Sequence, residues 1–179
     1  MSQTSFSPAA TTAAGYYDSD DADRFYAEIW GGEDIHVGLY ATDNEPIAQA
    51  SRRTVEALEA LIDDTIAARA SAGCRIVDLG SGYGGAARYL CRHPGVQVDA
   101  INISRVENSR HRSLNLEAGL QERITVHDAS FEAVPLPDGC ADVVWSQDAI
   151  LHSGDRQQVM REAARVLRPG GVMVMTDPM

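Results

Sequence analysis

The fold is decided by residues 77–85, which read VDLGSGYGG. They continue a short apolar run, Arg75 to Leu79, that predicts a β-strand, and they lead into a predicted helix from Gly84 to about His93. Glycine allows a positive φ and lets a ligand approach the backbone closely. The stretch fits two patterns, the dinucleotide fingerprint Gly80-x-Gly82-x-x-Gly85 and the spacing Asp78-x-Gly80-x-Gly82-x-Gly84. A tight turn without any ligand is the third interpretation that the loop alone leaves open.

Strands and helices are predicted to alternate after this loop. Such alternation is typical of a parallel sheet with helices on both faces, connected by right-handed crossovers. Ligands of these sheets bind beyond the carboxyl ends of the strands. The predicted strands cover residues 96–103, 123–127, 141–146 and 171–176, and the predicted helices cover residues 106–118 and 155–167. The expected fold class is therefore α/β, with a doubly wound, Rossmann-like parallel sheet of five strands.

The residues before the sheet change in character along their length. Residues 1–15 are rich in Ser, Thr and Ala and predict a disordered lead-in. Residues 16–70 predict an N-terminal helical cap that begins with a short helix from Asp20 or Asp21 to about Trp30. A long helix is expected after Pro46, because apolar residues recur on one helical face as far as Ile66. Residues 71–179 then form the ligand-binding core.

Composition narrows the class of protein. The chain has 179 residues, of which 26 are acidic and 15 basic, and its formal net charge is −11. Nucleic-acid binding requires a basic surface, so no nucleic-acid partner is expected. No apolar run approaches the roughly 20 residues that span a bilayer, so no membrane partner is expected. The three cysteines, Cys74, Cys91 and Cys140, form no C-x-x-C pair, which predicts reduced thiols in a cytoplasmic protein and no zinc site.

The ends of the later strands separate the two glycine patterns. A dinucleotide site favours a carboxylate at the end of the second strand, where this chain has Asn102. Asn102 suits one ribose hydroxyl, and Glu107 on the next helix suits another. Asp128 follows the third strand, and LRPGG at 167–171 precedes the fifth. In this order the motifs resemble those of the S-adenosylmethionine (SAM) dependent methyltransferases, in which the residue matching Asp128 accepts the adenine amino group.

This resemblance implies SAM as the cofactor and a set of residues that bind it. The set lies in the glycine loop, at the strand ends and in the cap, where His36 meets the amino-acid end of SAM. Its members are Asp78, Gly80, Gly82, Gly84, Asn102, Ile103, Glu107, Asp128, Ala129, Gln147 and His36.

Three further segments narrow the resemblance. They read YYDSDDADRFY at 16–26, WGGEDIHVGLY at 30–40 and WSQDAILHS at 145–153. Together they resemble the sarcosine/dimethylglycine N-methyltransferases of glycine betaine synthesis. The third segment is shared with the phosphoethanolamine methyltransferases, so it indicates the wider group and not the substrate. The resemblance implies N-methylation of a small amine, sarcosine and dimethylglycine in the first place.

Amine methylation explains two residues after the fourth strand. An ammonium must lose a proton before its lone pair can attack a methyl group, and positioning of the two reactants lowers the barrier. Asp148 and His152 share a face if the turn between them is helical, so Asp148 is expected to hold the ammonium and His152 to relay its proton. By resemblance, His152 pairs with a Tyr of the N-terminal helix, either Tyr17 or Tyr26. Structural roles for both stay open, as a helix cap for Asp148 and a loop contact for His152.

Aromatic residues gather in the cap. Tyr16, Tyr17, Tyr26, Trp30 and Tyr40 all lie there, although aromatic residues make up only 6% of the chain. Aromatic faces attract methylated ammonium groups, so this enrichment favours a cationic substrate. Packing of the cap onto the core is the alternative explanation. The acidic residues of segment 18–23 predict a solvated helix start, and no metal is expected.

The chain departs from the methyltransferase pattern at its end. Thr176 to Met179 follow the fifth strand directly, whereas the family has two more strands and roughly a hundred more residues by resemblance. The sequence therefore predicts a complete cofactor half and an incomplete substrate half, with weak or absent catalysis. A phosphoethanolamine methyltransferase and a non-catalytic SAM-binding fragment are the alternatives, and an NAD-dependent oxidoreductase is a distant one. The oligomeric state stays undetermined.

Overall fold

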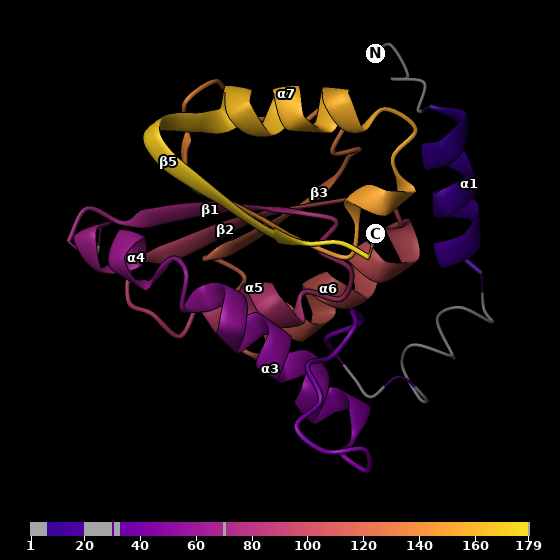
Figure 1. Ribbon diagram of the computed structural model, residues 1–179. Helices are drawn as coiled ribbons and strands as arrows, with labels where there is room; N and C mark the ends of the chain where they lie inside the picture. Colours follow the sequence, from indigo (N-terminus) through magenta and orange to yellow (C-terminus); the bar gives the residue numbers. More distant parts are fainter. Residues whose placement is uncertain (1–6, 20–29, 31–32, 70, 179) are drawn as a thin grey trace.

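A five-stranded sheet lies between two layers of helices in the computed structural model (Figure 1), which describes residues 7–19, 30, 33–69 and 71–178. Every strand pair is parallel, and the spatial order is β3-β2-β1-β4-β5. The strands are β1 (Cys74–Leu79), β2 (Val96–Asn102), β3 (Ile124–Asp128), β4 (Ala141–Gln147) and β5 (Leu167–Thr176). The predicted doubly wound α/β fold with five parallel strands is confirmed.

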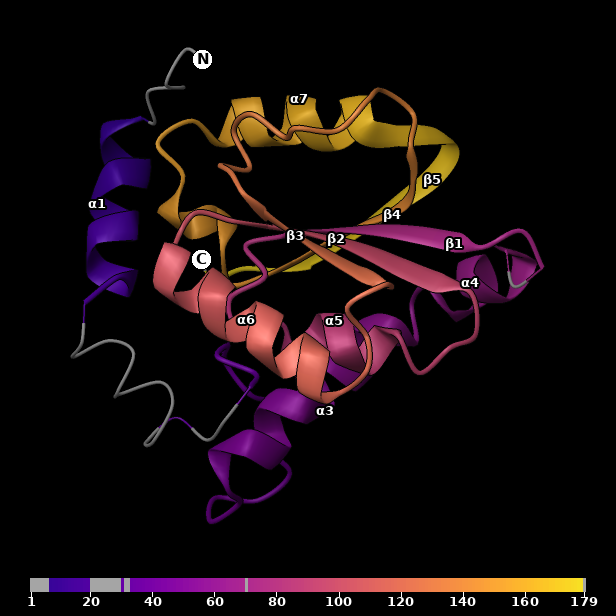
Figure 2. The same ribbon diagram turned by 180° about the vertical axis from the view of Figure 1, so that it is seen from behind.

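Helices cover both faces of this sheet. The helices are α1 (Pro8–Tyr17), α3 (Ile47–Glu59), α4 (Asp63–Arg69), α5 (Gly85–Leu90), α6 (Arg105–Glu117), η2 (Ile150–His152) and α7 (Arg156–Val166). One face carries α3 to α6 and the other carries α7, as the views from front and back show (Figure 2). No described helix is both long and apolar enough to cross a membrane.

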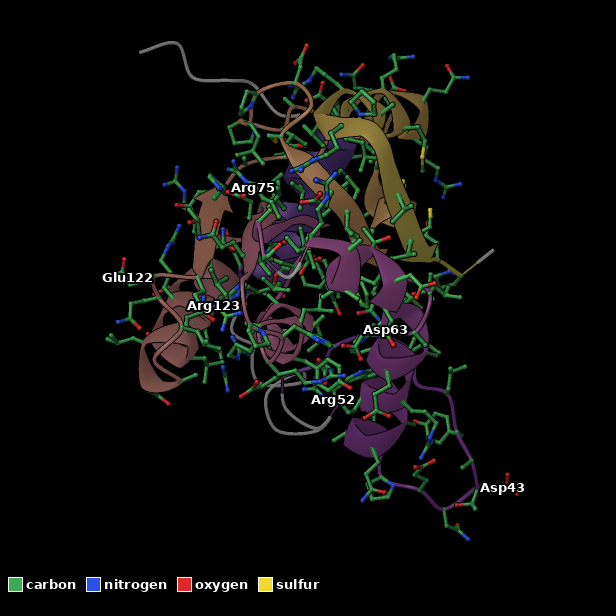
Figure 3. All side chains as sticks on the ribbon, turned by 90° about the vertical axis from the view of Figure 1, so that its left-hand side faces the viewer. Asp43, Arg52, Asp63, Arg75, Glu122 and Arg123 are labelled. Carbon is green, nitrogen blue, oxygen red and sulfur yellow. The ribbon has the colours of Figure 1, made fainter. Side chains whose placement is uncertain are left out.

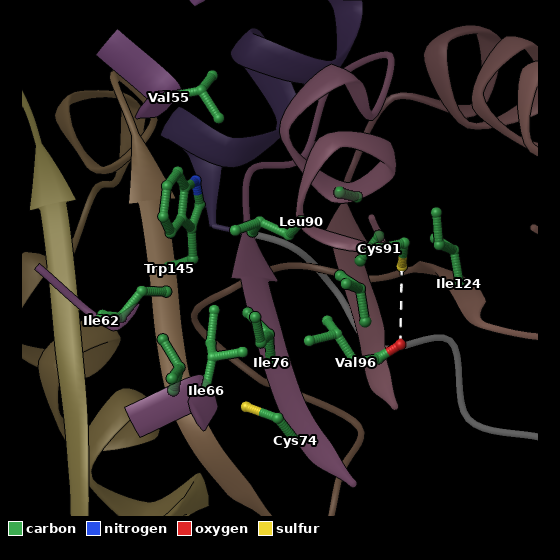
Figure 4. Close-up of a cluster of buried hydrophobic side chains, with 14 of the residues drawn as sticks. Val55, Ile62, Ile66, Cys74, Ile76, Leu90, Cys91, Val96, Ile124 and Trp145 are labelled. Carbon is green, nitrogen blue, oxygen red and sulfur yellow. Dashed lines mark hydrogen bonds between the residues drawn. The ribbon is translucent and has the colours of Figure 1, made fainter. Parts of the chain in front are cut away.

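Two apolar cores hold the layers together. The first joins α3, α4 and α5 to the sheet around Trp145 and Ile76, which are both fully buried (Figure 4). The second joins α7 to the other face around Val77 and Val144. Central parallel strands are buried on both faces, so they read as continuous apolar runs and not as alternating ones. Burial raises the pKa of the Cys74 and Cys91 thiols to about 11, which keeps both protonated at neutral pH.

The predicted long helix after Pro46 is in fact two helices. The helix α3 ends at Glu59, and α4 begins at Asp63 after a tight turn in which Ile62 N–H donates to the Glu59 carbonyl. Asp63 and Asp64 fall in the first turn of α4, where acidic side chains complement the helix dipole. The apolar stripe still runs across the break, because Ile62 and Ile66 are both buried.

The lead-in and the last strand also differ from the prediction. Residues 8–15 were expected to be disordered, but they belong to α1, whose Pro8 suits the first helical position and whose alanines favour helix. The strand β5 begins at Leu167 and not at Gly171, because Leu167 already pairs with Ala141 before a bulge shifts the register. The short helix expected to end near Trp30 lies outside the described residues.

The order of the strands indicates where a ligand binds, because it reverses direction between β1 and β4. The connections after β1 and β4 leave in opposite directions, since β1 is followed by β2 on one side and β4 by β5 on the other. A crevice opens at such a switch point beyond the carboxyl ends of the strands. The loops after Leu79, Asn102 and Gln147 therefore meet at one edge of the sheet.

Candidate active site

One cleft lies at this edge, over the glycine loop. It has two ends that share Ile35, Gly80, Gly82 and Gln147. The first end is lined by apolar and neutral side chains together with Tyr17, Glu107, Asp148 and His152. The second end is lined by Glu33, Asp34, His36, Asp78 and Ser81. We call them the broad end and the acidic end.

The glycine loop packs tightly against other segments of the chain, at Ala149 and at His111. Gly80, Gly82 and Gly84 all have a positive φ, of 82°, 49° and 79°. A Cβ built on Gly80 would lie 2.2 Å from the Ala149 Cβ, and one built on Gly84 would lie 1.9 Å from His111 Nε2. Side chains at these positions are therefore excluded both by backbone conformation and by space.

Asn102 and Glu107, the two residues predicted to hold ribose hydroxyls, meet at the broad end. The Asn102 amide donates to Glu107 Oε2 over 2.9 Å, and both side chains are buried. The helix α6 begins beside them with Ser104, whose hydroxyl accepts from Glu107 N–H. This N-cap fixes the first turn of α6 and with it the Glu107 carboxylate. Ile103 lines the same end of the cleft.

The acidic end holds buried polar groups. His36 and Asp34 are 6% and 7% exposed, and burial lowers the pKa of His36 to about 4. Burial also raises the pKa of Asp78 to about 7. Four buried side-chain atoms that line this end have no hydrogen-bond partner among the described residues: Asp34 Oδ1, His36 Nε2, Ser81 Oγ and Gln147 Nε2. Buried polar atoms usually have partners, so these four atoms are candidates for contact with a polar ligand in the cleft.

Tyr17 and His152 form a hydrogen-bonded pair at the broad end. The Tyr17 hydroxyl lies 3.0 Å from His152 Nε2, and the two rings meet edge to face. Burial lowers the pKa of His152, so its imidazole is neutral at neutral pH and has one ring nitrogen free of a proton. The sequence left Tyr17 and Tyr26 as alternatives for the partner of His152, and the structure places Tyr17 there. Tyr26 lies outside the described residues.

Asp148 lies beside this pair, but not on the same helical face. It has a φ of 48°, and the single-turn helix η2 begins only at Ile150, so the expected helical turn from Asp148 to His152 is wrong. The Asp148 carboxylate instead accepts from Val37 N–H over 2.6 Å. Asp148 thus ties the segment before α3 to the end of β4, and it is no helix cap. Both Asp148 and His152 nevertheless line the broad end.

Some predicted cofactor residues lie elsewhere. Asp128 and Ala129 line an adjoining hollow that shares only Ser130 with the cleft. The Asp128 carboxylate accepts from Asn108 and Arg112, and the Ala129 N–H donates to the Asn102 carbonyl. Gly84 does not line the cleft either, because it faces His111.

The aromatic cap contributes less to the cleft than its composition suggests. Tyr17 lines it, whereas Tyr16 and Tyr40 are 53% and 52% exposed. Trp30 donates from its indole to the His36 carbonyl, which supports the segment at the acidic end. Phe131, which follows β3, lines the broad end and was not singled out from the sequence.

Other lining residues were also missed. Asp34 and Ile35 stand in the WGGEDIH segment, in which the sequence analysis assigns roles only to Trp30 and His36. Ser130 and Ala149 directly follow predicted residues along the chain. Ala13 carries no sequence signal, because only the docking of α1 brings it to the cleft.

A group of metal-ligand types lies away from the cleft. Among the described residues, donor atoms of Glu59, Asp63 and His93 lie within 4.8 Å of one another. Arg92 and His93 already occupy the carboxylate of Glu59.

Comparison with known proteins agrees with this geometry. The model of the family described as "Methyltransferase domain" matches residues 77–175. A dimethylglycine N-methyltransferase of Parasynechococcus marenigrum (strain WH8102) is 60% identical over 179 residues, which are 100% of this chain and 62% of the relative. A sarcosine/dimethylglycine N-methyltransferase of Halorhodospira halochloris is 54% identical over 171 residues, 96% of this chain and 60% of the relative.

A solved structure shows the same fold. The crystal structure of a candidate sarcosine dimethylglycine methyltransferase from Galdieria sulphuraria superimposes with a TM-score of 0.82 at 50% identity, over 89% of this chain and 60% of that one. The chain thus spans about three fifths of the length of these relatives.

The chain belongs to the methyltransferase-domain family. Within it, the resemblance to the sarcosine/dimethylglycine N-methyltransferases is confirmed by relatives of that name.

Proposed function

We propose that this chain is a SAM-dependent N-methyltransferase of the cytoplasm that methylates sarcosine and dimethylglycine, with glycine betaine as the final product. One observation carries the proposal. A single cleft unites the glycine loop, the Asn102–Glu107 pair and the Tyr17–His152 pair beside Asp148, in a chain more than half identical to relatives named for these substrates.

The donor set of the cleft fits SAM. Asn102 and Glu107 offer an amide and a carboxylate to ribose hydroxyls, and Ile103 and Phe131 offer apolar surface to a base. The unpartnered polar atoms of the acidic end suit a zwitterionic amino acid. When bound, this cofactor supplies a methyl group on a sulfonium. The position of Asp128 outside the cleft leaves its contact with adenine a prediction.

The broad end must bind the ammonium group of the methyl acceptor and remove a proton from it. The ammonium needs an anionic partner, and the Asp148 carboxylate lines the cleft there. It must also lose a proton, and the neutral His152 imidazole is able to accept one. Tyr17 holds the imidazole through its hydroxyl and so orients the ring. These residues bind, orient and deprotonate an amine.

The described lining residues offer no cationic side chain to an anionic group of the acceptor. No Arg lines either end of the cleft among the described residues, and the chain contains no Lys. A phosphoethanolamine site would need such cations for the phosphate. The carboxylate of sarcosine likewise finds no ionic partner among the described lining residues, so recognition of the amine end supports the proposal.

The test is methyl transfer by the purified chain. SAM is supplied with dimethylglycine, sarcosine or phosphoethanolamine, and formation of S-adenosylhomocysteine and of the methylated product is measured. Because the chain spans about three fifths of the length of its relatives, we expect slow turnover with the first two acceptors and none with phosphoethanolamine. Tyr17→Phe is expected to lower kcat about tenfold or more, because the hydroxyl that orients the base is lost.

Tyr16→Phe is the matched control, since this neighbouring ring is exposed and should leave kcat unchanged. Turnover of phosphoethanolamine alone, or none with any acceptor, would contradict the proposal.

A further inference from the structure

Asp34 has one carboxylate oxygen bound and the other without a partner. Oδ2 pairs with an Arg52 guanidinium nitrogen of α3 over 2.8 Å. Oδ1 is buried and has no hydrogen-bond partner among the described residues. The residue is 7% exposed, so solvent does little to satisfy this oxygen. A buried carboxylate oxygen left in this way is costly unless a ligand completes it.

The surroundings hold this carboxylate at the cleft. Asp34 lines the acidic end beside His36 and Asp78. A Cβ built on Gly85 would lie 2.1 Å from Asp34 Oδ1, so the absence of a side chain there makes room for the carboxylate. Arg52, which is labelled in Figure 3, reaches it from α3. Two separate elements thus fix Asp34.

The charges at the acidic end favour a cation at this oxygen. Besides Asp34, its carboxylates are Glu33, which already pairs with Arg88, and Asp78, whose pKa burial raises to about 7. Its other buried unpartnered atoms belong to the neutral side chains of His36, Ser81 and Gln147. Burial raises the pKa of Asp34, and the Arg52 charge opposes that rise. An ammonium group that donates a hydrogen bond to Oδ1 would replace the hydration that this oxygen loses on burial.

We infer that Asp34 is a cofactor-binding residue that receives the ammonium of the amino-acid end of SAM, with Arg52 as the residue that positions it. This inference rests on the proposed function and deepens it. The alternative is that Asp34 only supports the glycine loop. The two roles differ in one respect, because only the first depends on whether the ligand carries an amino acid.

The experiment compares two ligands by calorimetric titration. S-adenosylhomocysteine has the amino-acid end, and 5′-methylthioadenosine has the same nucleoside without it. Both are titrated into the wild-type chain, Asp34→Asn and Asp43→Asn. Asp43 is the matched control, because it is an exposed residue at the loop tip before α3, far from Arg52 (Figure 3).

We expect Asp34→Asn to weaken S-adenosylhomocysteine at least tenfold, which is about 1.4 kcal/mol, and to change methylthioadenosine less than twofold. Asp43→Asn should change neither. Equal loss of both ligands would make Asp34 a structural support and overturn the inference, as would unchanged binding of both. Absence of binding by the wild-type chain would overturn the proposed function as well, so the two failures are distinguishable.

Discussion

Asp78 is the first residue of the motif Asp78-x-Gly80-x-Gly82-x-Gly84, and its carboxyl group is almost inaccessible to solvent. It is 3% exposed and lines the acidic end of the cleft. Burial disfavours its charged form, which is why its pKa rises to about 7. Near pH 7 about half of the folded molecules therefore hold a proton there, whereas the unfolded chain has released it.

This raised pKa predicts a pH-dependent stability. Between the ordinary value of 3.8 and about 7 the folded state binds more protons than the unfolded state, so the contribution of Asp78 to stability falls as pH rises through this window. Asp78→Asn removes the titration at nearly constant shape. We expect the variant to gain up to about 4 kcal/mol relative to wild type between pH 4 and pH 8.

Urea unfolding of both proteins at several pH values measures this difference. Taking the difference between the two proteins cancels the opposite trend of His36 and His111, whose pKa values are lowered by burial. A difference that does not change with pH would contradict a raised pKa of Asp78.

At the scale of elements, α6 supports the glycine loop. Arg110 stacks over the Tyr83 ring at 4.8 Å, and the next residue, His111, lies against Gly84. The same helix presents Glu107 to the cleft. The helix α6 therefore positions both the glycine loop and Glu107, the predicted ribose ligand. A substitution that shifts the loop against α6 is therefore expected to shift Glu107 as well.

Gly84→Ala tests this support. The substitution adds a Cβ where φ is 79° and where His111 Nε2 would be 1.9 Å away. Strain of the left-handed conformation costs about 1 kcal/mol, and overpacking adds about 1–3 kcal/mol. We expect a total loss of about 2–4 kcal/mol in urea unfolding.

Gly170→Ala is the control for backbone strain. Gly170 has the same φ of 79° but open space around it, so only about 1 kcal/mol should be lost. His111→Ala in the Gly84→Ala background should recover part of the difference between the two variants. Equal losses at Gly84 and Gly170 would show that the His111 contact contributes nothing.

At the scale of the whole molecule, α1 closes one side of the cleft. It stands against η2 and α6 at the carboxyl edge of the sheet (Figures 1 and 2). Tyr17 binds His152, and the Asp18 carboxylate accepts from the Ser104 hydroxyl over 2.7 Å. The N-terminal helix is thus fastened both to the proposed base and to the helix that carries Glu107.

Asp18→Ala is expected to loosen α1 from the core. It removes the acceptor of Ser104, which contributes roughly 1 kcal/mol, and should speed amide hydrogen exchange of residues 8–17 several-fold while the sheet is unaffected. The loss of an anion at the carboxyl end of α1 would by itself favour that helix, so faster exchange reports undocking. Thr12→Ala, at an exposed site of α1, should not speed exchange. Unchanged exchange in Asp18→Ala would show that this contact does not hold α1.

The sheet and its order of elements were predictable because local patterns carry them. Apolar runs at the length of strands alternate with helical periods, and glycines mark the one loop that needs a positive φ. Asn102 and Glu107 could be paired from sequence for the same reason, since a strand end and the next helix turn are only 5 residues apart. The break between α3 and α4 was missed because the apolar stripe continues across it.

The sequence by itself determined the doubly wound sheet, the glycine loop and the family, since these depend on residue types at short spacing. Only the tertiary structure decided that Tyr17 meets His152 across 135 residues, that Asp148 binds Val37 N–H, and that Asp34 keeps one oxygen without a partner among the described residues. It also placed Asp128 outside the cleft. The physical reason is that contacts between distant segments depend on how helices pack on the sheet, and no local periodicity encodes that packing.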